Sequence, residues 1–258
     1  MAAANALIGY TGFVGGNILD QKSFDFLYNS KNIETIAGKK FDVVVCAGVP
    51  AVKWLANKEP ENDRAIIKKL TDNLEKIEAK KFILISTVDV YPATKKINED
   101  CVIDTQILQP YGKHRRQLEE FISQRFDSLI VRLPGLFGRG LKKNPLFDLM
   151  QGNFTYIHPE NTLQFYNLAY IWKDINKSLE NNLKVVNFVT EPVALKVRAE
   201  KTLKTHLPDN PAPPTQSYDI STKHAALWGN TNSYLYSKKQ VLEDIKTFIS
   251  SYNKSQTG

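Results

Sequence analysis

A short apolar segment near the amino end of the chain runs into a turn in which every third residue is glycine. The apolar residues are 6–8, and glycine follows at Gly9, Gly12 and Gly15 before apolar residues resume at helical spacing. This order predicts a strand, a tight turn and a helix. Glycines spaced in this way are typical of turns that hold a dinucleotide pyrophosphate, because no Cβ blocks the bend, the ligand or the helix–strand contact. The alternative is a glycine-rich turn that binds nothing.

Strand and helix patterns alternate along the first half of the chain. Helical patterns, with apolar residues three and four apart, cover residues 62–79 and 111–126. Short apolar runs predict strands over residues 24–28, 41–46, 82–86 and 129–133, and the continuous β-branched run at 41–46 is typical of a strand buried on both faces. Strands that alternate with helices predict a parallel, doubly wound sheet.

The organisation changes after Pro134. Glycines, prolines and basic residues crowd residues 135–145, whereas residues 185–189 again resemble a buried strand and residues 238–252 an amphipathic helix. We therefore expect an α/β protein in two parts. Residues 1–135 would form the dinucleotide-binding sheet. Residues 136–258 would mainly form a smaller lobe at its carboxyl edge, where open α/β folds bind ligands, with the segment near 165–189 returning to the sheet.

Composition narrows the choice of partners. The 258-residue chain is 42% hydrophobic and carries a net charge of +7, which favours an anionic partner such as a nucleotide cofactor, a nucleotide-sugar or nucleic acid. Basic residues are scattered, so we expect no nucleic-acid partner. No apolar run approaches the roughly 20 residues that cross a bilayer, and we interpret the apolar start as a strand. Two cysteines and four histidines without metal-ligand spacing predict no metal site, and we expect a cytoplasmic protein.

The end of the second predicted strand bears on the choice of dinucleotide. An acid that binds the ribose 2′-hydroxyl is expected there, but this chain has Asn29, Ser30 and Lys31. A carboxylate would repel a 2′-phosphate, whereas a hydroxyl and an ammonium group can bind one, so the segment favours NADP over NAD. Lys31 can equally be an ordinary exposed loop lysine. Ala47 and Gly48 end the third strand, and we expect them to line the adenosine.

Four motifs occur in an order that marks a family. They are Gly9-x-x-Gly12-x-x-Gly15, Ser86-Thr87-Val-Asp-Val-Tyr91-Pro, Tyr111-Gly-Lys-His-Arg115 and Arg132-Leu-Pro-Gly-Leu-Phe-Gly138. In this combination the chain resembles the extended short-chain dehydrogenase/reductase superfamily, the NAD-dependent epimerase/dehydratase group. Weaker matches extend the resemblance over nearly the whole chain, including residues 165–179, which are similar to the family's helix after the substrate loop. The resemblance implies a Rossmann fold with a small C-terminal substrate-binding lobe, and similar proteins are usually helix-paired homodimers.

The resemblance also implies catalytic roles. In this family a Ser or Thr, a Tyr and a Lys surround a substrate carbonyl or alcohol beside the nicotinamide. Thr87 occupies the first position and would hydrogen-bond the reacting oxygen, and Tyr111 would be the general acid/base. A free phenol has a pKa of about 10, so it needs a neighbouring cation to work near neutrality. Arg115 stands where the family has lysine; it can still depress the tyrosine pKa and hold ribose hydroxyls, but the exchange is not conservative. The alternative is a surface Tyr and Arg on a structural helix.

Asp89 lies two residues after Thr87, where sugar-nucleotide 4,6-dehydratases carry the glutamate of Thr-Asp-Glu and GDP-fucose synthase has another acid/base residue. Val88 replaces the dehydratase acid, which argues against water elimination. Asp89 is therefore a candidate proton carrier for epimerisation, and the alternative is a carboxylate that caps backbone N–H groups. We interpret His114, in the helix of Tyr111, as a polar helix residue.

The remaining assignments concern substrate and cofactor. Arg139, Lys142 and Lys143 fall where the family contacts its substrate's diphosphate, and a solvated basic loop is the alternative. The implied function is an NADP- or NAD-dependent oxidoreductase or epimerase that reduces or epimerises a nucleotide-activated 4-keto-sugar. The alternative is an NADP-binding sensor or regulatory subunit without turnover. The residues expected to bind the cofactor are Gly9, Thr11, Gly12, Phe13, Val14, Gly15, Asn29, Ser30, Lys31, Ala47, Gly48, Ser86, Tyr111, Arg115 and Pro134.

Overall fold

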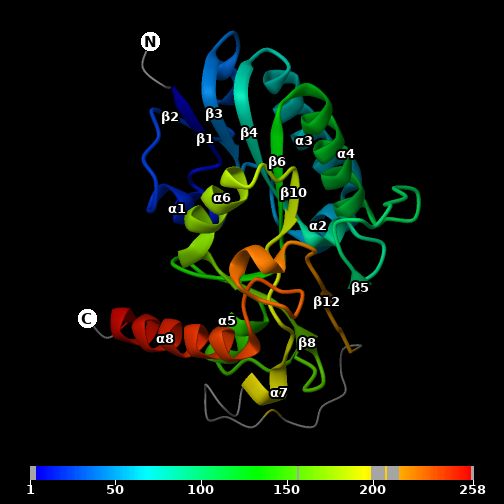
Figure 1. The fold of residues 1–258 in the computed structure, drawn as a ribbon, viewed down its shortest axis with the longest axis vertical. Coiled ribbons are helices and arrows are strands. Elements are labelled where there is room, and N and C mark those ends of the chain that lie inside the picture. Colours follow the sequence, from blue (N-terminus) through cyan, green and yellow to red (C-terminus); the bar gives the residue numbers. More distant parts are fainter. Residues whose placement is uncertain (1–3, 156, 199–206, 208–214, 257–258) are drawn as a thin grey trace. The chain divides into compact units, whose positions relative to one another are not determined.

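The computed structural model describes residues 4–155, 157–198, 207 and 215–256. The chain divides into two compact units, each assembled from segments that are far apart in the sequence (Figure 1). Unit 1 comprises Met1–Pro92, Cys101–Arg132 and Tyr170–Val186. Unit 2 comprises Ala93–Asp100, Leu133–Ala169 and Asn187–Gly258. None of the helices in the described residues is long and apolar enough to cross a membrane.

Unit 1 is built on a six-stranded sheet of order β10-β6-β4-β3-β1-β2. Its strands are β1 (Asn5–Ile8), β2 (Phe26–Tyr28), β3 (Lys40–Cys46), β4 (Glu78–Thr87), β6 (Ser128–Leu133) and β10 (Val185–Asn187). β1 pairs in parallel with both β2 and β3, and β4 continues the sheet in parallel from β3. The chain first moves outward to β2 and then crosses to the other side of β1, so the direction of winding reverses between β1 and β3. This topology confirms the predicted doubly wound Rossmann sheet.

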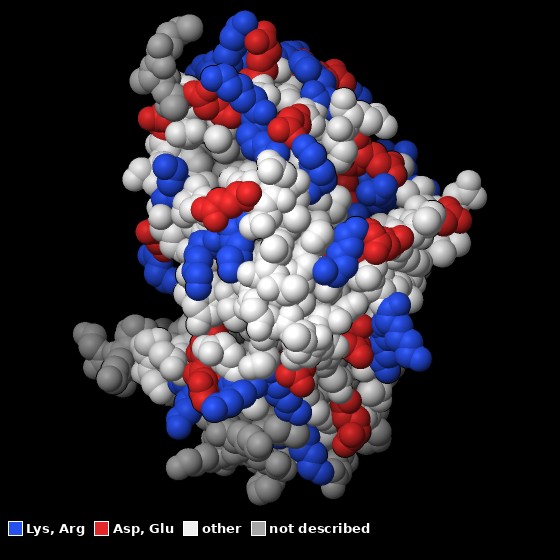
Figure 2. Space-filling view, viewed as in Figure 1, with Lys and Arg blue, Asp and Glu red and all other residues white. Residues whose placement is uncertain are grey.

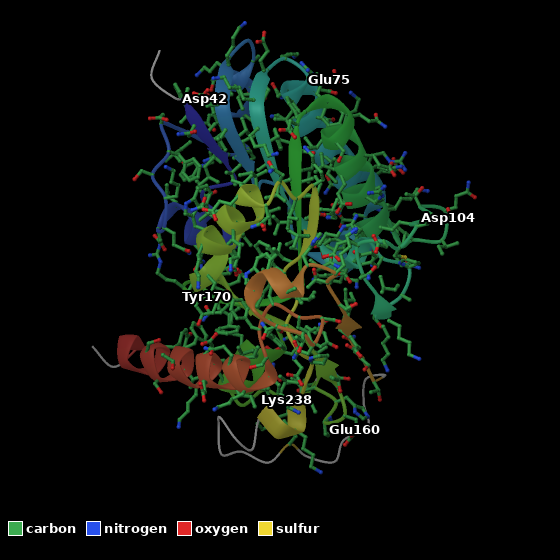
Figure 3. The ribbon with its side chains drawn as sticks, viewed as in Figure 1. Asp42, Glu75, Asp104, Glu160, Tyr170 and Lys238 are labelled. Carbon is green, nitrogen blue, oxygen red and sulfur yellow. The ribbon has the colours of Figure 1, made fainter. Side chains whose placement is uncertain are left out.

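Helices cover both faces of this sheet (Figure 1). α1 (Phe13–Leu19) and α6 (Ile171–Glu180) pack together on one face, while α2 (Lys53–Lys58), α3 (Pro60–Leu74) and α4 (Pro110–Arg125) form the other layer. The layer of α2, α3 and α4 closes a core with the sheet that includes the buried side chains of Leu74, Phe82 and Ile122, and Ile18 of α1 is buried as well. Asp42, labelled in Figure 3, marks the amino ends of the strands. The carboxyl ends therefore lie at the opposite end of the sheet.

Several predicted elements have different bounds in the structure, and two of the differences have a physical reason. The helix expected over 62–79 ends at Leu74, and β4 already begins at Glu78. Ile77 keeps its place in the apolar pattern because the turn between the two elements buries it. Residues 165–179, expected as one helix, begin as the strand β9 (Phe165–Asn167) and the short 3-10 helix η3 (Leu168–Tyr170) before α6.

Unit 2 consists of short strands paired two by two and of the helices α5 (Pro145–Met150), α7 (Leu195–Arg198) and α8 (Lys238–Gln256). β7 (Gly135–Phe137) pairs with β9, β8 (Thr162–Leu163) with β11 (Val193–Ala194), and β5 (Lys95–Ile97) with β12 (Asp219–Ile220). The buried amide of Gln164 donates to the carbonyls of Thr190 and Ile220, each at 2.7 Å, and accepts from the N–H of Ile220 at 3.0 Å. Such cross-links hold together strands too short to be stable alone.

Candidate active site

The glycine turn after β1 is packed so closely that two of its glycines leave no space for a side chain. Gly9 has φ +88°, and a Cβ there would lie 2.5 Å from the carbonyl oxygen of Ala47. A Cβ on Gly15 would collide with the carbonyl oxygen of Gly9. Gly12 is exposed, and its N–H donates to the same carbonyl at 2.9 Å. Packing of β1 against α1 and β3 thus requires Gly9 and Gly15, and Gly12 presents bare backbone to solvent.

This turn lies where the winding of the sheet reverses. Gly9 touches Ala47 and Gly48, which follow β3 directly. Ligands of open α/β sheets bind outside the carboxyl ends of the strands at such a reversal. The bare backbone on both sides of the reversal fits a dinucleotide, because side chains there would fill the space it needs. Of the other residues expected at the turn, Thr11 is exposed and Phe13 and Val14 are half-buried.

The loop after β2 is ordered by its own hydrogen bonds and joined to the turn. The N–H of Gly9 donates to the carbonyl of Tyr28 at 2.7 Å. The side-chain oxygen of Asn29 accepts from the N–H of Lys31 at 2.8 Å, and its amide group donates to the Tyr10 hydroxyl at 3.2 Å. Lys31, like Ser30, is exposed. The two residues expected to distinguish NADP from NAD therefore sit on an ordered loop beside the glycine turn.

Thr87 and Tyr111 meet at the carboxyl end of β4. Thr87 ends the strand, and Tyr111 lies in the first turn of α4 with only 7% of its surface exposed. The hydroxyl of Thr87 is near enough to the Tyr111 phenol to lower the pKa of that phenol. The hydroxyl of Thr87 also accepts from the N–H of Asp89 at 3.1 Å, and Asn57 of α2 accepts from the N–H of Tyr111 at 2.9 Å. The structure thus brings together the two hydroxyls to which the resemblance gives the chemistry.

Gly112 makes this meeting possible. A Cβ at this position would collide with the carbonyl oxygen of Asp89, which lies in the short 3-10 helix η2 (Val88–Val90). Only glycine allows η2 to lie directly against the first turn of α4. The carboxylate of Asp89 pairs with Lys53 at 2.7 Å, while its N–H is the group bonded to Thr87. Sequence reasoning quoted Gly112 within a motif but gave it no role.

Arg115 is held by a partner that the sequence analysis did not identify. Its two terminal nitrogens bind the carboxylate of Asp63 at 2.6 and 2.9 Å and also donate to the carbonyls of Tyr111 and Pro50. His114, expected as an ordinary polar residue, is buried with Nδ1 2.7 Å from Asp63. The guanidinium carbon lies 3.9 Å from the centre of the Tyr111 ring. Arg115 is therefore a fixed, paired cation beside the phenol.

The surroundings of Tyr111 correct one expectation. Burial raises the pKa of its phenol, and this effect is the largest. The charge of Arg115 lowers the pKa, the charge of Asp89 raises it, and Lys53 and the hydrogen bond with Thr87 lower it, but the net direction is upward from 10.0. Arg115 thus lowers the pKa of the phenol, as expected, but by less than burial raises it. Near neutral pH the phenol keeps its proton, which makes it a proton donor.

Ser86, expected to bind the cofactor, has its hydroxyl committed elsewhere. It donates at 2.6 Å to Glu119, and Glu119 also binds the guanidinium of Arg132 at 2.6 and 3.0 Å. Arg132 in turn donates to the hydroxyl of Tyr91 at 2.8 Å. All four side chains are buried in unit 1. The motif residues Ser86, Tyr91 and Arg132 therefore join β4 and β6 to α4.

The remaining predicted site residues belong to unit 2, whereas the cluster around Tyr111 belongs to unit 1. Pro134 is half-buried between β6 and β7. Arg139, Lys142 and Lys143 are exposed in the segment that precedes α5.

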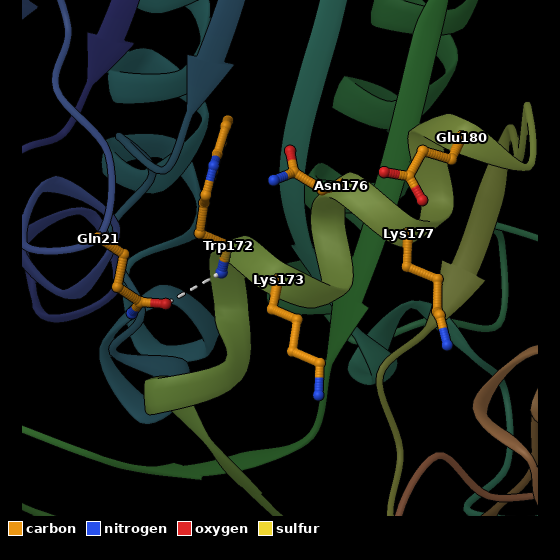
Figure 4. A pocket seen from close by; sticks show the side chains of 6 residues that line it. All are labelled: Gln21, Trp172, Lys173, Asn176, Lys177 and Glu180. Carbon is orange, nitrogen blue, oxygen red and sulfur yellow. Dashed lines mark hydrogen bonds between the residues drawn. The ribbon is translucent and has the colours of Figure 1, made fainter.

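Elsewhere on unit 1, a shallow pocket of about 510 Å³ lies along α6 (Figure 4). Charges of both signs line it, and both signs also alternate over the described part of the face in Figure 2. Such mixing differs from the single-sign surfaces that bind nucleic acid. Among the described residues, no cluster of His, Cys, Asp or Glu is placed to hold a metal ion. The pocket contains none of the predicted site residues and is lined by Gln21, Trp172, Lys173, Asn176, Lys177 and Glu180.

Solved structures share this fold along nearly the whole chain. The UDP-N-acetylglucosamine 4-epimerase of Methanobrevibacter ruminantium M1, in complex with UDP-N-acetylmuramic acid, aligns over 98% of this chain and 99% of its own with TM-score 0.75 and 15% identity. MoeE5, in complex with UDP-glucuronic acid and NAD, aligns over 98% and 100% with TM-score 0.73 and 14% identity. The dTDP-4-dehydrorhamnose reductase of Bacillus anthracis str. Ames, in complex with NADP, aligns over 97% and 99% with TM-score 0.73 and 14% identity. The fold of this chain is therefore that of nucleotide-sugar epimerases and reductases.

No protein-family model matches the sequence, and no curated protein sequence matches it significantly.

Proposed function

We propose that this chain is an NAD(P)-dependent enzyme of the extended short-chain dehydrogenase/reductase type that reduces or epimerises a nucleotide-activated sugar. The observation that carries the proposal is the approach of the hydroxyls of Thr87 and Tyr111 at the carboxyl end of β4. This pair and the glycine turn after β1 belong to the same sheet end, and the similar solved structures are nucleotide-sugar epimerases and reductases. Function at 14–15% identity still rests on the site residues rather than on the fold.

The cofactor would lie across the reversal point between β1 and β3. Backbone at Gly9, Gly12 and Gly15 would face its pyrophosphate, and Ala47 and Gly48 its adenosine. The exposed hydroxyl and ammonium groups of Ser30 and Lys31 suit a 2′-phosphate, which favours NADP over NAD. When bound, the nicotinamide would supply or accept the hydride.

The chain's own contribution is proton handling at one oxygen. Thr87 would hydrogen-bond the substrate oxygen that changes between carbonyl and alcohol. Tyr111 would give its phenolic proton to that oxygen as the alcohol forms, or take it back in the opposite direction. Because burial raises the pKa of this phenol, the protonated donor is the resting form. The site is thus better prepared for reduction of a 4-keto-sugar than for the oxidation that begins an epimerisation.

Two further assignments complete the proposal. Asp89, paired with Lys53, would serve as a second proton carrier if the enzyme epimerises. The exposed basic residues Arg139, Lys142 and Lys143 would bind the diphosphate of the nucleotide-sugar.

Tyr111→Phe tests the proposal. Oxidation of NADPH is followed with a panel of dTDP- and UDP-4-keto-sugars, and cofactor affinity is measured separately by nucleotide fluorescence. Loss of the general acid should lower kcat by about 10²- to 10⁴-fold and leave the Kd for NADPH nearly unchanged. Tyr91→Phe is the matched control, since this buried tyrosine bonds Arg132 instead. Unchanged turnover in Tyr111→Phe would remove the catalytic assignment.

One observation favours a second candidate, a cofactor-binding sensor without turnover. Both terminal nitrogens of Arg115, the residue at the family's lysine position, are already bonded to Asp63 and to backbone carbonyls. NADPH binding by the wild-type chain, with no turnover of any sugar in the panel, would favour this candidate.

A further inference from the structure

A second cation lies at the start of α4, and the roles assigned above leave it unused. Lys53 begins α2, and its Nζ lies 2.7 Å from Oδ1 of Asp89. Lys53 and Asn57 are four residues apart, so they share a face of α2. Asn57 accepts the N–H of Tyr111 at 2.9 Å, which fixes that face of α2 against the first turn of α4.

The other half of the ion pair is attached to the same turn. The backbone of Asp89 lies against Gly112, the residue after Tyr111, so closely that no Cβ fits between them. The N–H of Asp89 donates to the hydroxyl of Thr87, and this hydroxyl lies near the phenol of Tyr111. Both members of the pair are therefore held next to Tyr111 by backbone contacts on two sides.

The two cations near the phenol differ in how freely they can act. Arg115 is 4% exposed, and its charge is balanced by Asp63, which also contacts His114. Lys53 has 48% of its side chain exposed and its partner Asp89 has 21%. The guanidinium of Arg115 is buried and makes two hydrogen bonds to Asp63, so it cannot reorient during a reaction. The half-exposed ammonium of Lys53, on its flexible side chain, can.

Among the described residues, five titratable or charged groups lie around Tyr111, on four different elements. Arg115 and His114 come from α4 itself, Asp63 from α3, Asp89 from η2 and Lys53 from α2. Asp63 of α3 and His114 and Arg115 of α4 are buried and bound to one another. The only pair among these five groups with appreciable solvent contact is Lys53 with Asp89.

We propose that the Lys53–Asp89 ion pair controls the ionisation of Tyr111, with Lys53 as the positioning cation that Arg115 is too firmly held to be. Lys53 favours the phenolate and Asp89 favours the phenol, so movement of either charge adjusts the proton affinity of the acid/base residue. Its use in turnover rests on the proposed function, whereas its electrostatic effect on the phenol does not.

The test uses the full chain labelled with ¹³Cζ-tyrosine, in which the Tyr111 resonance is assigned by its loss in Tyr111→Phe. The ionised fraction of Tyr111 is read at about pH 10, the ordinary pKa of a phenol, after circular dichroism shows each variant folded at that pH. Asp89→Asn should raise the ionised fraction above wild type at least about twofold. Lys53→Met in the Asp89→Asn background should lower it again, and Lys53→Arg in that background should restore it.

Lys58→Met, at the other end of α2, is the matched control and should leave the fraction unchanged. The proposal is overturned if Asp89→Asn leaves the fraction unchanged or lowers it, or if Lys53→Met does not reverse the rise. The pH profile of kcat for the same variants is measured separately. If the variants change the ionised fraction of Tyr111 as expected but neither they nor the wild type turn over any sugar, the ion-pair proposal stands and the proposed enzymatic function fails. The two failures are therefore distinguishable.

Discussion

Helix α4 carries two clusters of charge that differ in how far they are closed. At its middle, Glu119 and Arg132 have side chains 1% and 3% exposed and are bonded to each other and to Ser86 and Tyr91. At its first turn, the buried pair of Arg115 and Asp63 adjoins the partly exposed pair of Lys53 and Asp89. A closed cluster can only hold elements together, whereas a cluster that reaches solvent can also meet a ligand and exchange a proton.

Two adjacent residues of β4, Ser86 and Thr87, belong to different clusters. Ser86 donates to Glu119 at the middle of α4, whereas Thr87, the last residue of β4, lies near Tyr111 in the first turn of the same helix. The four predictions that follow test whether the first cluster serves stability and the second serves chemistry.

The largest effect on stability is expected from Glu119→Gln. The substitution leaves the charge of Arg132 buried without its partner, which should lower the free energy of unfolding by about 3 to 5 kcal/mol. Glu120→Gln is the control, because Glu120 forms a half-exposed pair with Arg116 and its loss should cost at most about 0.5 kcal/mol. Urea unfolding measures both. Equal losses in the two variants would contradict the closed character of the Glu119 cluster.

Asp63→Asn should have the next largest effect and lower the free energy of unfolding by about 2 to 4 kcal/mol. In this variant Arg115 keeps its carbonyl partners but loses its counter-ion. Burial by itself raises the pKa of Asp63, but hydrogen bonds from Arg115 and His114, and then their charges, bring it below 3.8.

The direction of that shift fixes a pH dependence. Where the folded-state pKa is the lower one, the unfolded chain binds a proton that the folded chain does not, so this part of the stability is present above about pH 4 and is lost as pH falls through the folded-state pKa. Asparagine cannot titrate. Wild-type stability should therefore fall more steeply than that of Asp63→Asn below about pH 4, and parallel curves would contradict the assignment.

Gly112→Ala should lower the free energy of unfolding by about 2 kcal/mol, because the new Cβ would displace the carbonyl of Asp89. The same displacement separates Thr87 from Tyr111, so turnover should fall more than stability explains. Gly16→Ala, in α1, is the control: the nearest atom to its Cβ would be 3.7 Å away, and alanine there should be neutral or stabilising. Full kcat in folded Gly112→Ala would show that the close approach of η2 is not needed.

The smallest losses of stability are expected for Ser86→Ala and Thr87→Val. Ser86→Ala should lose about 1.5 kcal/mol for one hydrogen bond to a carboxylate, with cofactor affinity and kcat unchanged. Thr87→Val should lower the free energy of unfolding by a similar amount, about 1 kcal/mol, because its hydroxyl caps η2, but unlike Ser86→Ala it should also lower kcat by about 10²-fold. Denaturation and kinetics on this pair of variants compare the two clusters on α4 directly. The same phenotype in both would abolish the distinction.

The sequence predicted the features that depend on local pattern. The glycine turn and the alternation of strands with helices follow from spacing and order along the chain, whereas Thr87 and Tyr111 were assigned through the resemblance to a known family. The end of α3 was misplaced because Ile77 continues the helical spacing while lying in a turn. β9 was missed because a three-residue strand is defined by its partner, β7, rather than by its own residues.

The electrostatics of the site could not be predicted in this way. Asp63 and Arg115 are 52 residues apart, and Lys53 and Asp89 are 36 apart. No spacing rule joins them, because α2 and η2 come to the first turn of α4 only in the folded sheet. An acid in the first turn of α3 gives no sign that it will bind the residue at the family's lysine position. Burial of Tyr111, which raises its pKa, is likewise a property of the fold.

The most direct measurement is a crystal structure of the chain with NADP(H) bound. The account predicts the pyrophosphate against the backbone of Gly9, Gly12 and Gly15, and the nicotinamide beside the hydroxyls of Thr87 and Tyr111. A dinucleotide bound away from the reversal between β1 and β3, or a nicotinamide out of reach of the Tyr111 phenol, would contradict it.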